Sequence, residues 1–188
     1  MTPRESYDWL RAHSVQTAYL ASAAEVLAWD QRTCMPPGGH PHRAGQMAAM
    51  ARLLHERSTD PRIGEHLARV EGNALVACPT DPEAVNVREW RRDFDRSLRI
   101  PERLAVELAR ASTEGESAWE TARPAGDWEG FQPFLERICS LQRQKAQALG
   151  FDGEPYDALV DEFEPGETAA GLAALFDGLR RQLVPLAA

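Results

Sequence analysis

Helical periodicity dominates this chain from one end to the other. Its apolar residues recur at steps of three and four, which places them on one face of an α-helix. A clear example is the series Val87, Trp90, Phe94 and Leu98. No segment sustains the alternation of apolar and polar residues that a half-buried strand requires. The pattern therefore predicts an all-α fold, a multi-helix array in which helices joined by short turns pack antiparallel.

Proline, glycine and aspartate mark the expected ends of these helices. The first helix is expected from about Pro3 to Trp29, because the stretch MPPGGHP that follows cannot continue it. Asp60-Pro61 and Asp81-Pro82 each place an N-cap residue before a proline, and so each predicts a helix start. Gly150 is expected to end the sixth helix. Further helix starts are expected at Pro101, Asp127 and Thr168.

The apolar stripes also predict which side chains lie inside. Tyr19 and Val26 belong to a wide apolar face on the first helix, and Trp119 and Trp128 are expected to point inward from the fifth and sixth. The last helix has a strong stripe, formed by Leu172, Leu175, Phe176, Leu179 and Leu183. Burying a large apolar side chain is worth roughly 1.5 to 3 kcal/mol. This possible association face therefore needs a partner surface, in the same chain, in a second copy or in a missing remainder.

Length and charge exclude several classes of protein. A sequence of 188 residues fits one domain, so residues 1–188 are expected to form a single all-helical unit. The net charge of −8 disfavours nucleic acid as a partner, and no apolar run is long enough to span a membrane. The first residues lack the apolar region of a secretory signal, which predicts a cytoplasmic location. Three cysteines without C-x-x-C spacing indicate neither a disulfide framework nor a zinc knuckle.

The stretch LLHERSTD places a histidine directly before a glutamate, as the zinc-binding motif H-E-x-x-H does. The residue four positions after His55 is Thr59, which cannot replace an imidazole as a zinc ligand. His40-Pro41-His42 offers two histidines in an expected surface loop, with no third ligand nearby in the sequence. His13 and His66 stand singly on helices, where we expect partial exposure or hydrogen bonding. The sequence therefore predicts no metal ligands and no catalytic residues in this chain.

Acidic residues gather beside the Pro165-Gly166 turn, namely Asp157, Asp161, Glu162 and Glu164. Paired carboxylates can perform acid–base catalysis if one of them is desolvated. A charged run next to a Pro-Gly turn is more often solvated surface, which is the interpretation that we favour. The arginines and acids that alternate over residues 88–96 likewise predict a self-paired, solvated helix face.

Three ordered segments carry a family resemblance. They are LAWDQRTCMPPGG at residues 27–39, REWRRDFDR at 88–96 and YDALVDEFEPG at 156–166. Together they resemble the N-terminal part of the carboxypeptidase Taq family of thermostable zinc metallocarboxypeptidases. The stretches ARLLHERSTDP and LFDGLRRQLVPL are also similar, so the resemblance spans nearly the whole chain.

The resemblance implies an all-α, commonly homodimeric enzyme that removes residues from the C-terminus of peptides, with zinc held by H-E-x-x-H and a later glutamate. In such enzymes the N-terminal helices form a lid beside a deep groove. The metal-binding and catalytic motifs lie outside the matched part. We therefore expect a truncated or split member, inactive alone, that acts on peptides only with a separate catalytic half. The alternatives are a stand-alone helical module for dimerisation or protein interaction and, less favoured, a metal site at His40 and His42.

The resemblance also singles out particular residues. Trp29, Asp30 and Gln31 look like a structural motif at a helix end, whose polar groups are expected to satisfy free backbone groups of the following loop. Arg32 reverses the charge at a position where the family usually has an acid. The possible groove-facing residues are Tyr156, Asp157, Asp161 and Glu162.

Overall fold

A computed structural model describes residues 1–187, and this part of the chain contains helices and no strand. The α-helices are α1 (Pro3–Thr33), α2 (His40–Ser58), α3 (Pro61–Val70), α4 (Pro82–Arg99), α5 (Glu102–Ala125), α6 (Trp128–Leu149), α7 (Asp157–Val160) and α8 (Ala169–Ala187). Two short 3-10 turns, η1 (Pro37–Gly39) and η2 (Ala74–Val76), lie in the connections. The predicted all-α fold is confirmed.

The chain divides into two compact units, Met1–Leu141 and Gln142–Ala188. The organisation of residues 1–188 as one domain stays a prediction. None of the described helices is long and apolar enough to cross a membrane. The cytoplasmic location stays a prediction as well.

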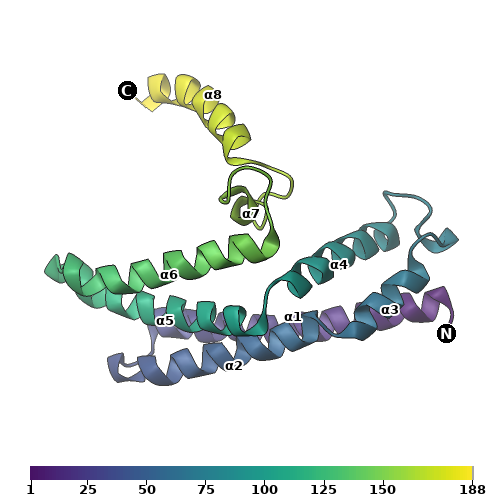
Figure 1. The fold of residues 1–188 in the computed structure, drawn as a ribbon, viewed down its shortest axis with the longest axis horizontal. Coiled ribbons are helices and arrows are strands. Elements are labelled where there is room, and N and C mark those ends of the chain that lie inside the picture. The colour runs from purple at the N-terminus through teal and green to yellow at the C-terminus, as the bar shows by residue number, and fades with distance from the viewer. Residues whose placement is uncertain (188) are drawn as a thin grey trace. The chain divides into compact units, whose positions relative to one another are not determined.

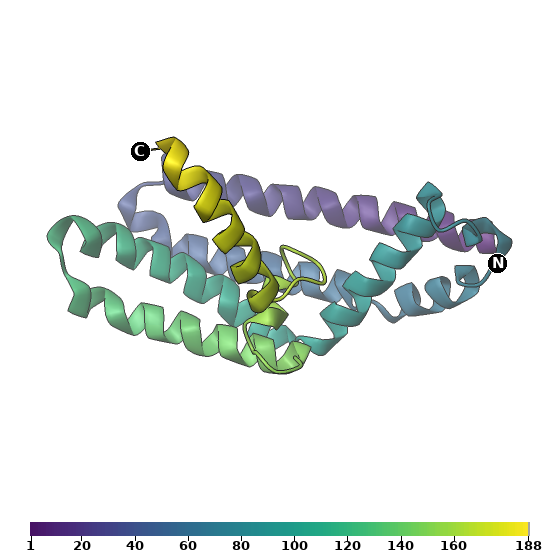
Figure 2. The same cartoon turned by 90° about the horizontal axis from the view of Figure 1, so that it is seen from above.

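In the first unit, α2 is the central helix. Figures 1 and 2 show α1 and α2 side by side and antiparallel, joined by the short connection that contains η1. Helix α5 lies along α2, and α3 packs against α1 near the N-terminus. Neighbouring helices therefore pack largely antiparallel within this unit, as the short connections predict.

Local sequence signals set the helix ends. Thr2 forms a capping box with Glu5, in which the Thr2 hydroxyl accepts a bond from the Glu5 N–H and the Glu5 carboxylate accepts one from the Thr2 N–H. The Asp60 carboxylate accepts a bond from the Arg62 N–H at the start of α3. Helix α1 continues to Thr33, four residues past the expected end, because the first residue that cannot extend it is Pro36.

The core of the first unit joins α1, α3 and α4. Its buried members are Tyr7, Leu10, Ile63, Leu67, Val70, Val87 and Phe94. Leu67 and Val70 are fully buried. This contact explains why α3 is stable although it has only 10 residues, since short helices depend on the packing of an apolar face.

Several side chains expected inside are exposed. Helix α1 buries Ala24 on the side facing its neighbours, so Tyr19 and Val26 lie on the far side and are 70% and 63% exposed. Leu98 is exposed near the end of α4. Trp119 and Trp128 stand near the α5–α6 turn and are also exposed. The apolar face of each of these helices is wider than the part that a neighbouring helix covers. Periodicity in the sequence identifies the apolar face, but it does not show how much of that face is buried.

The second unit is built from the end of α6, α7 and α8. Gly150 has φ of +78° and directly follows α6, which confirms the expected C-terminal glycine. The Thr168 hydroxyl accepts a bond from the Gly171 N–H and caps α8 at the expected start. Most of the apolar stripe on α8 is exposed, with Leu175 and Phe176 each 57% exposed.

Candidate functional site

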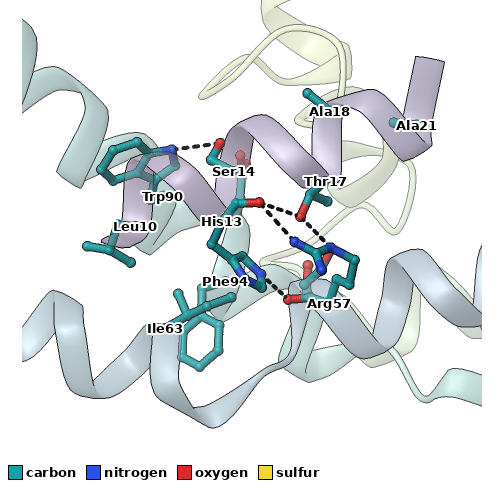
Figure 3. A pocket seen from close by; sticks show the side chains of 13 residues that line it. Leu10, His13, Ser14, Thr17, Ala18, Ala21, Arg57, Ile63, Trp90 and Phe94 are labelled. Carbon is teal, nitrogen blue, oxygen red and sulfur yellow. Dashed lines mark hydrogen bonds between the residues drawn. The ribbon is translucent and has the colours of Figure 1, made fainter. Parts of the chain in front are cut away.

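A pocket opens between α1, α2, α3 and α4 of the first unit (Figure 3). Its volume is about 240 Å³. The apolar part of its wall comes from Leu10, Ile63, Trp90 and Phe94. Hydroxyl groups and two charged side chains complete the wall, so the pocket combines an apolar lining with a few polar groups, as small-molecule sites do.

Arg57 of α2 fixes one side of this pocket. Its Nε donates to the Thr17 hydroxyl at 2.9 Å and its Nη2 donates to the His13 carbonyl at 3.1 Å, both on α1. The His13 ring in turn contacts the Arg57 carbonyl at 2.9 Å. Figure 3 shows this reciprocal arrangement, which holds α1 and α2 in one register. Arg57 is therefore a rigid cationic group in the pocket wall.

Asp93 of α4 supplies a negative charge to the same pocket. Partial burial raises the pKa of the Asp93 carboxyl, although Arg92 and Arg96 act in the opposite direction. Trp90, one turn earlier on α4, donates from its Nε1 to the Ser14 hydroxyl at 3.2 Å and closes the pocket against α1 (Figure 3).

The zinc ion that the family resemblance implies can be compared with the side chains that the structure describes. Within residues 1–187 no three histidine, cysteine, aspartate or glutamate side chains come together as metal ligands. A zinc ion needs at least three protein ligands in a catalytic site. The described residues therefore do not fit the zinc ion that the family resemblance implies.

The four possible groove-facing residues have different roles in the second unit. Tyr156 and Glu162 line a common hollow with Lys145, whose ammonium is 2.5 Å from the Glu162 carboxylate. Asp157 accepts a bond from the Ala169 N–H at 2.7 Å, and Asp161 accepts one from the Gly166 N–H at 2.9 Å. These two carboxylates organise the backbone around α7, and only Tyr156 and Glu162 line the hollow.

The Trp29-Asp30-Gln31 segment lies inside α1, and its two polar side chains contact other helices. Asp30 pairs with Arg43 of α2, and the buried Gln31 donates from Nε2 to Glu116 of α5 at 2.8 Å. Neither side chain makes the expected bond to the backbone of the following loop in the part of the chain described. Trp29 is 60% exposed.

Arg32 and Gln31 share one partner. The Arg32 Nε donates to the second oxygen of Glu116 at 2.6 Å, so this carboxylate receives bonds from two consecutive residues of α1. The reversed charge at Arg32 therefore has a partner on α5 within the first unit.

The His40-Pro41-His42 stretch forms the first turn of α2, where a surface loop was expected. Proline is tolerated there because the first N–H groups of a helix have no helical partner. The His40 Nε2 is 4.0 Å from Glu120, and His42 is exposed. No third ligand joins them among the described residues.

Two other histidines stack on one tryptophan. The Trp9 ring stacks with the rings of both His13 and His66, at centroid distances of 5.0 and 4.2 Å. His66 is buried and its Nδ1 has no hydrogen-bond partner among the described residues, contrary to the expected partial exposure or hydrogen bonding, because α3 places it against α1 in the same contact as Leu67. Burial and the nearby Arg69 and Arg62 lower the pKa of His66, while Glu65 and Asp60 act in the opposite direction.

We expect the folded chain to lose stability as the pH falls below about 6.5, the ordinary pKa of histidine. The folded-state pKa of His66 is lowered, so the unfolded chain binds a proton first and is favoured on acidification. One group limits the slope to about 1.4 kcal/mol per pH unit. Denaturant unfolding at pH 7.5, 6.5 and 5.5 measures this dependence.

His66→Phe, which keeps an aromatic ring beside Trp9, is expected to flatten that slope. His42→Ala removes an exposed histidine and is the matched control. Equal slopes for the unmodified chain and His66→Phe would contradict the assignment to His66.

Sequence reasoning missed Arg57 and Asp93 as members of one pocket, and Arg43 and Glu116 as cross-helix partners. Arg57 directly follows the His55-Glu56 pair, which resembles the start of a zinc-binding motif, but its role depends on the register of α1 against α2. Arg43 is buried, and buried arginines are rare unless paired. Gln31 and Glu116 are 85 residues apart, and no local motif or periodicity in the sequence predicts that they meet.

Comparisons with known proteins agree in pointing to one family. The model of the carboxypeptidase Taq (M32) metallopeptidases matches residues 9–188. Thermostable carboxypeptidase 1 of Thermus thermophilus is 53% identical over 192 residues, which cover 97% of this chain and 38% of the relative.

Solved structures have the same helical arrangement. The crystal structure of BsuCP has a TM-score of 0.81 at 26% identity and is matched over 98% of this chain and 36% of its own. The structure of Pyrococcus furiosus carboxypeptidase has a TM-score of 0.77 at 28% identity, over 97% of this chain and 36% of its own. This chain thus spans little more than a third of the length of these relatives.

Proposed function

Because this chain belongs to the carboxypeptidase Taq (M32) metallopeptidase family, we propose that its helices form the N-terminal, groove-covering part of a zinc metallocarboxypeptidase. Such an enzyme removes residues from the C-terminus of peptides. The observation that carries the proposal is the family match over residues 9–188, together with helices that superpose on solved carboxypeptidases. The proposed role of this part is to cover and shape the substrate groove.

The 188 residues alone are proposed to be catalytically inactive. Zinc in such an enzyme polarises the carbonyl of the substrate and lowers the pKa of a bound water. The residues described here offer no group of three metal ligands. Residues outside this region must therefore hold the metal, either in the same polypeptide or in a separate catalytic half.

Tyr156 and Glu162 are the residues of the second unit that we propose to face the groove. Both line the hollow beside α7, and the Tyr156 ring is 60% exposed, so its apolar face is available to a peptide. Asp157 and Asp161 are proposed to act indirectly, because their bonds to backbone N–H groups hold the segment that carries Tyr156.

A complementation assay tests this function. The 188-residue chain is incubated with a blocked peptide and zinc or cobalt, alone and with the unmatched part of the Thermus thermophilus relative produced separately. We expect no cleavage by either piece alone and release of C-terminal amino acids when both are present. Cleavage by the chain alone, or no gain from mixing two folded pieces, would refute the proposal.

Within the complemented enzyme, Tyr156→Ala is expected to raise KM while leaving the metal content unchanged. Phe151→Ala is the matched control, since Phe151 is an aromatic residue of the same unit that does not line the hollow. Equal KM values for the two variants would remove Tyr156 from the groove.

The exposed face of α8 supports a second candidate function, a helical module that binds a second copy of itself. Leu175, Phe176, Leu179 and Leu183 are all at least 40% exposed on one helix. Exposed apolar groups of this size favour association. Light scattering tests the idea, with Leu175→Glu as the disrupting variant. A chain that is strictly monomeric at high concentration would exclude homodimerisation by this part.

A further inference from the structure

The pocket of the first unit carries one positive and one negative side chain on different helices. Arg57 lines it from α2 and Asp93 lines it from α4. The remainder of the wall is largely apolar, with Trp90 and Phe94 as its aromatic members. This combination matches a ligand that has both a carboxylate and an ammonium group next to an apolar substituent.

Arg57 is preorganised to bind an anion. Its Nε and Nη2 are held by Thr17 and the His13 carbonyl, which fixes the plane of the guanidinium. Among the described residues Nη1 has no hydrogen-bond partner, so its N–H groups remain to be satisfied by water or a ligand. A guanidinium already fixed in this way loses little freedom when it binds a carboxylate.

Asp93 provides the opposite charge. Arg92 and Arg96 of the same helix act to lower the pKa of its carboxyl, but desolvation is the largest effect and raises that pKa. Partial burial disfavours its ionised form, and an ammonium group would relieve that unfavourable state.

The pocket size limits the ligand to a small molecule. A cavity of about 150 Å³ lined by apolar side chains can hold benzene. The volume of about 240 Å³ therefore has room for an apolar side chain together with the few backbone atoms of one amino acid. Leu10 and Ile63 also contact this space and favour an aliphatic or aromatic substituent.

We propose that this pocket binds a free α-amino acid with an apolar side chain, its carboxylate at Arg57, its ammonium at Asp93 and its side chain against Trp90 and Phe94. Free amino acids are the product class of the proposed peptidase reaction. The amino-acid site depends on the proposed peptidase function only for where the free amino acid comes from. The pocket would then let the protein respond to the product it helps to release.

Binding to the 188-residue chain tests the proposal without metal or peptide. L-leucine and L-phenylalanine are titrated by calorimetry and followed by tryptophan fluorescence, because Trp90 forms part of the wall. We expect saturable binding of both. N-acetyl-L-leucine lacks the ammonium, L-leucinamide lacks the carboxylate and glycine lacks the side chain. Each of these three compounds is expected to bind at least about ten-fold more weakly than leucine, because each lacks a charged hydrogen bond or an apolar contact.

Asp93→Asn is expected to weaken leucine binding about ten-fold, through loss of the charge on its side chain. Asp95→Asn is the matched control on the same helix, because Asp95 does not line the pocket. Circular dichroism checks that both variants are folded. Equal binding by the two variants, equal binding of leucine and its N-acetyl derivative, or no leucine binding at all would overturn the proposal. Failure of the complementation assay would leave this result unaffected, so the two proposals fail separately.

Discussion

Replacing Leu67 by alanine is expected to lower the free energy of unfolding by about 2 to 5 kcal/mol. Leu67 is fully buried where α3 meets α1 and α4. The truncated side chain leaves a cavity among Tyr7, Leu10 and Phe94, and close-packed neighbours fill such a space only in part. Denaturant unfolding followed by circular dichroism measures the change.

Leu98→Ala provides the matched control for this prediction. The chemical change is the same, but Leu98 is 55% exposed on α4. Its substitution is expected to have an effect below about 1 kcal/mol, since little apolar surface is removed from the interior. Similar losses for the two variants would show that the contact of α3 with α1 and α4 is not the stabilising core of this unit.

Replacing Arg43 by methionine is expected to lower the free energy of unfolding by about 3 kcal/mol. Arg43 is buried at the start of α2, and its guanidinium donates to the Leu27 carbonyl, the Asp30 carboxylate and the Gln46 side chain. Methionine keeps most of the apolar stem but leaves these acceptors without their donor. The same unfolding experiment measures the effect.

Asp30→Asn separates the charge of this contact from its hydrogen bond. Asparagine keeps an oxygen that can accept from Arg43, and Asp30 is partly exposed to water. We therefore expect a loss of about 1 kcal/mol or less. A larger loss for Asp30→Asn than for Arg43→Met would indicate that the ion pair, rather than the set of bonds made by Arg43, stabilises the α1–α2 contact.

The outcome for individual residues shows which features a sequence can predict. Asp60-Pro61, Gly150 and Thr168 mark helix ends correctly, because a cap acts within a few residues and needs no tertiary partner. Periodicity identified Val87 and Phe94 as core residues by the same local rule. It failed for Tyr19 and Trp128, since the exposure of a helix face depends on which neighbour covers it.

The candidate site was harder to predict from the sequence than the fold. The pocket brings Arg57 on α2 together with Asp93 on α4, and their proximity follows from the packing of both helices against α1. The bond of Gln31 to Glu116 likewise depends on the register between α1 and α5. The family resemblance drew attention to residues 29–31, but it gave no indication of these partners.

The ion pair of Lys145 has a practical consequence for labelling. Lys145 is the only lysine in the sequence, and its ammonium is held against Glu162 with little exposed surface. Amine-reactive labels and cross-linkers therefore find only one lysine side chain, which is hindered, and will identify few neighbouring residues. Thiol-reactive probes suit this protein better, because Cys34, Cys78 and Cys139 are all exposed and distributed along the chain.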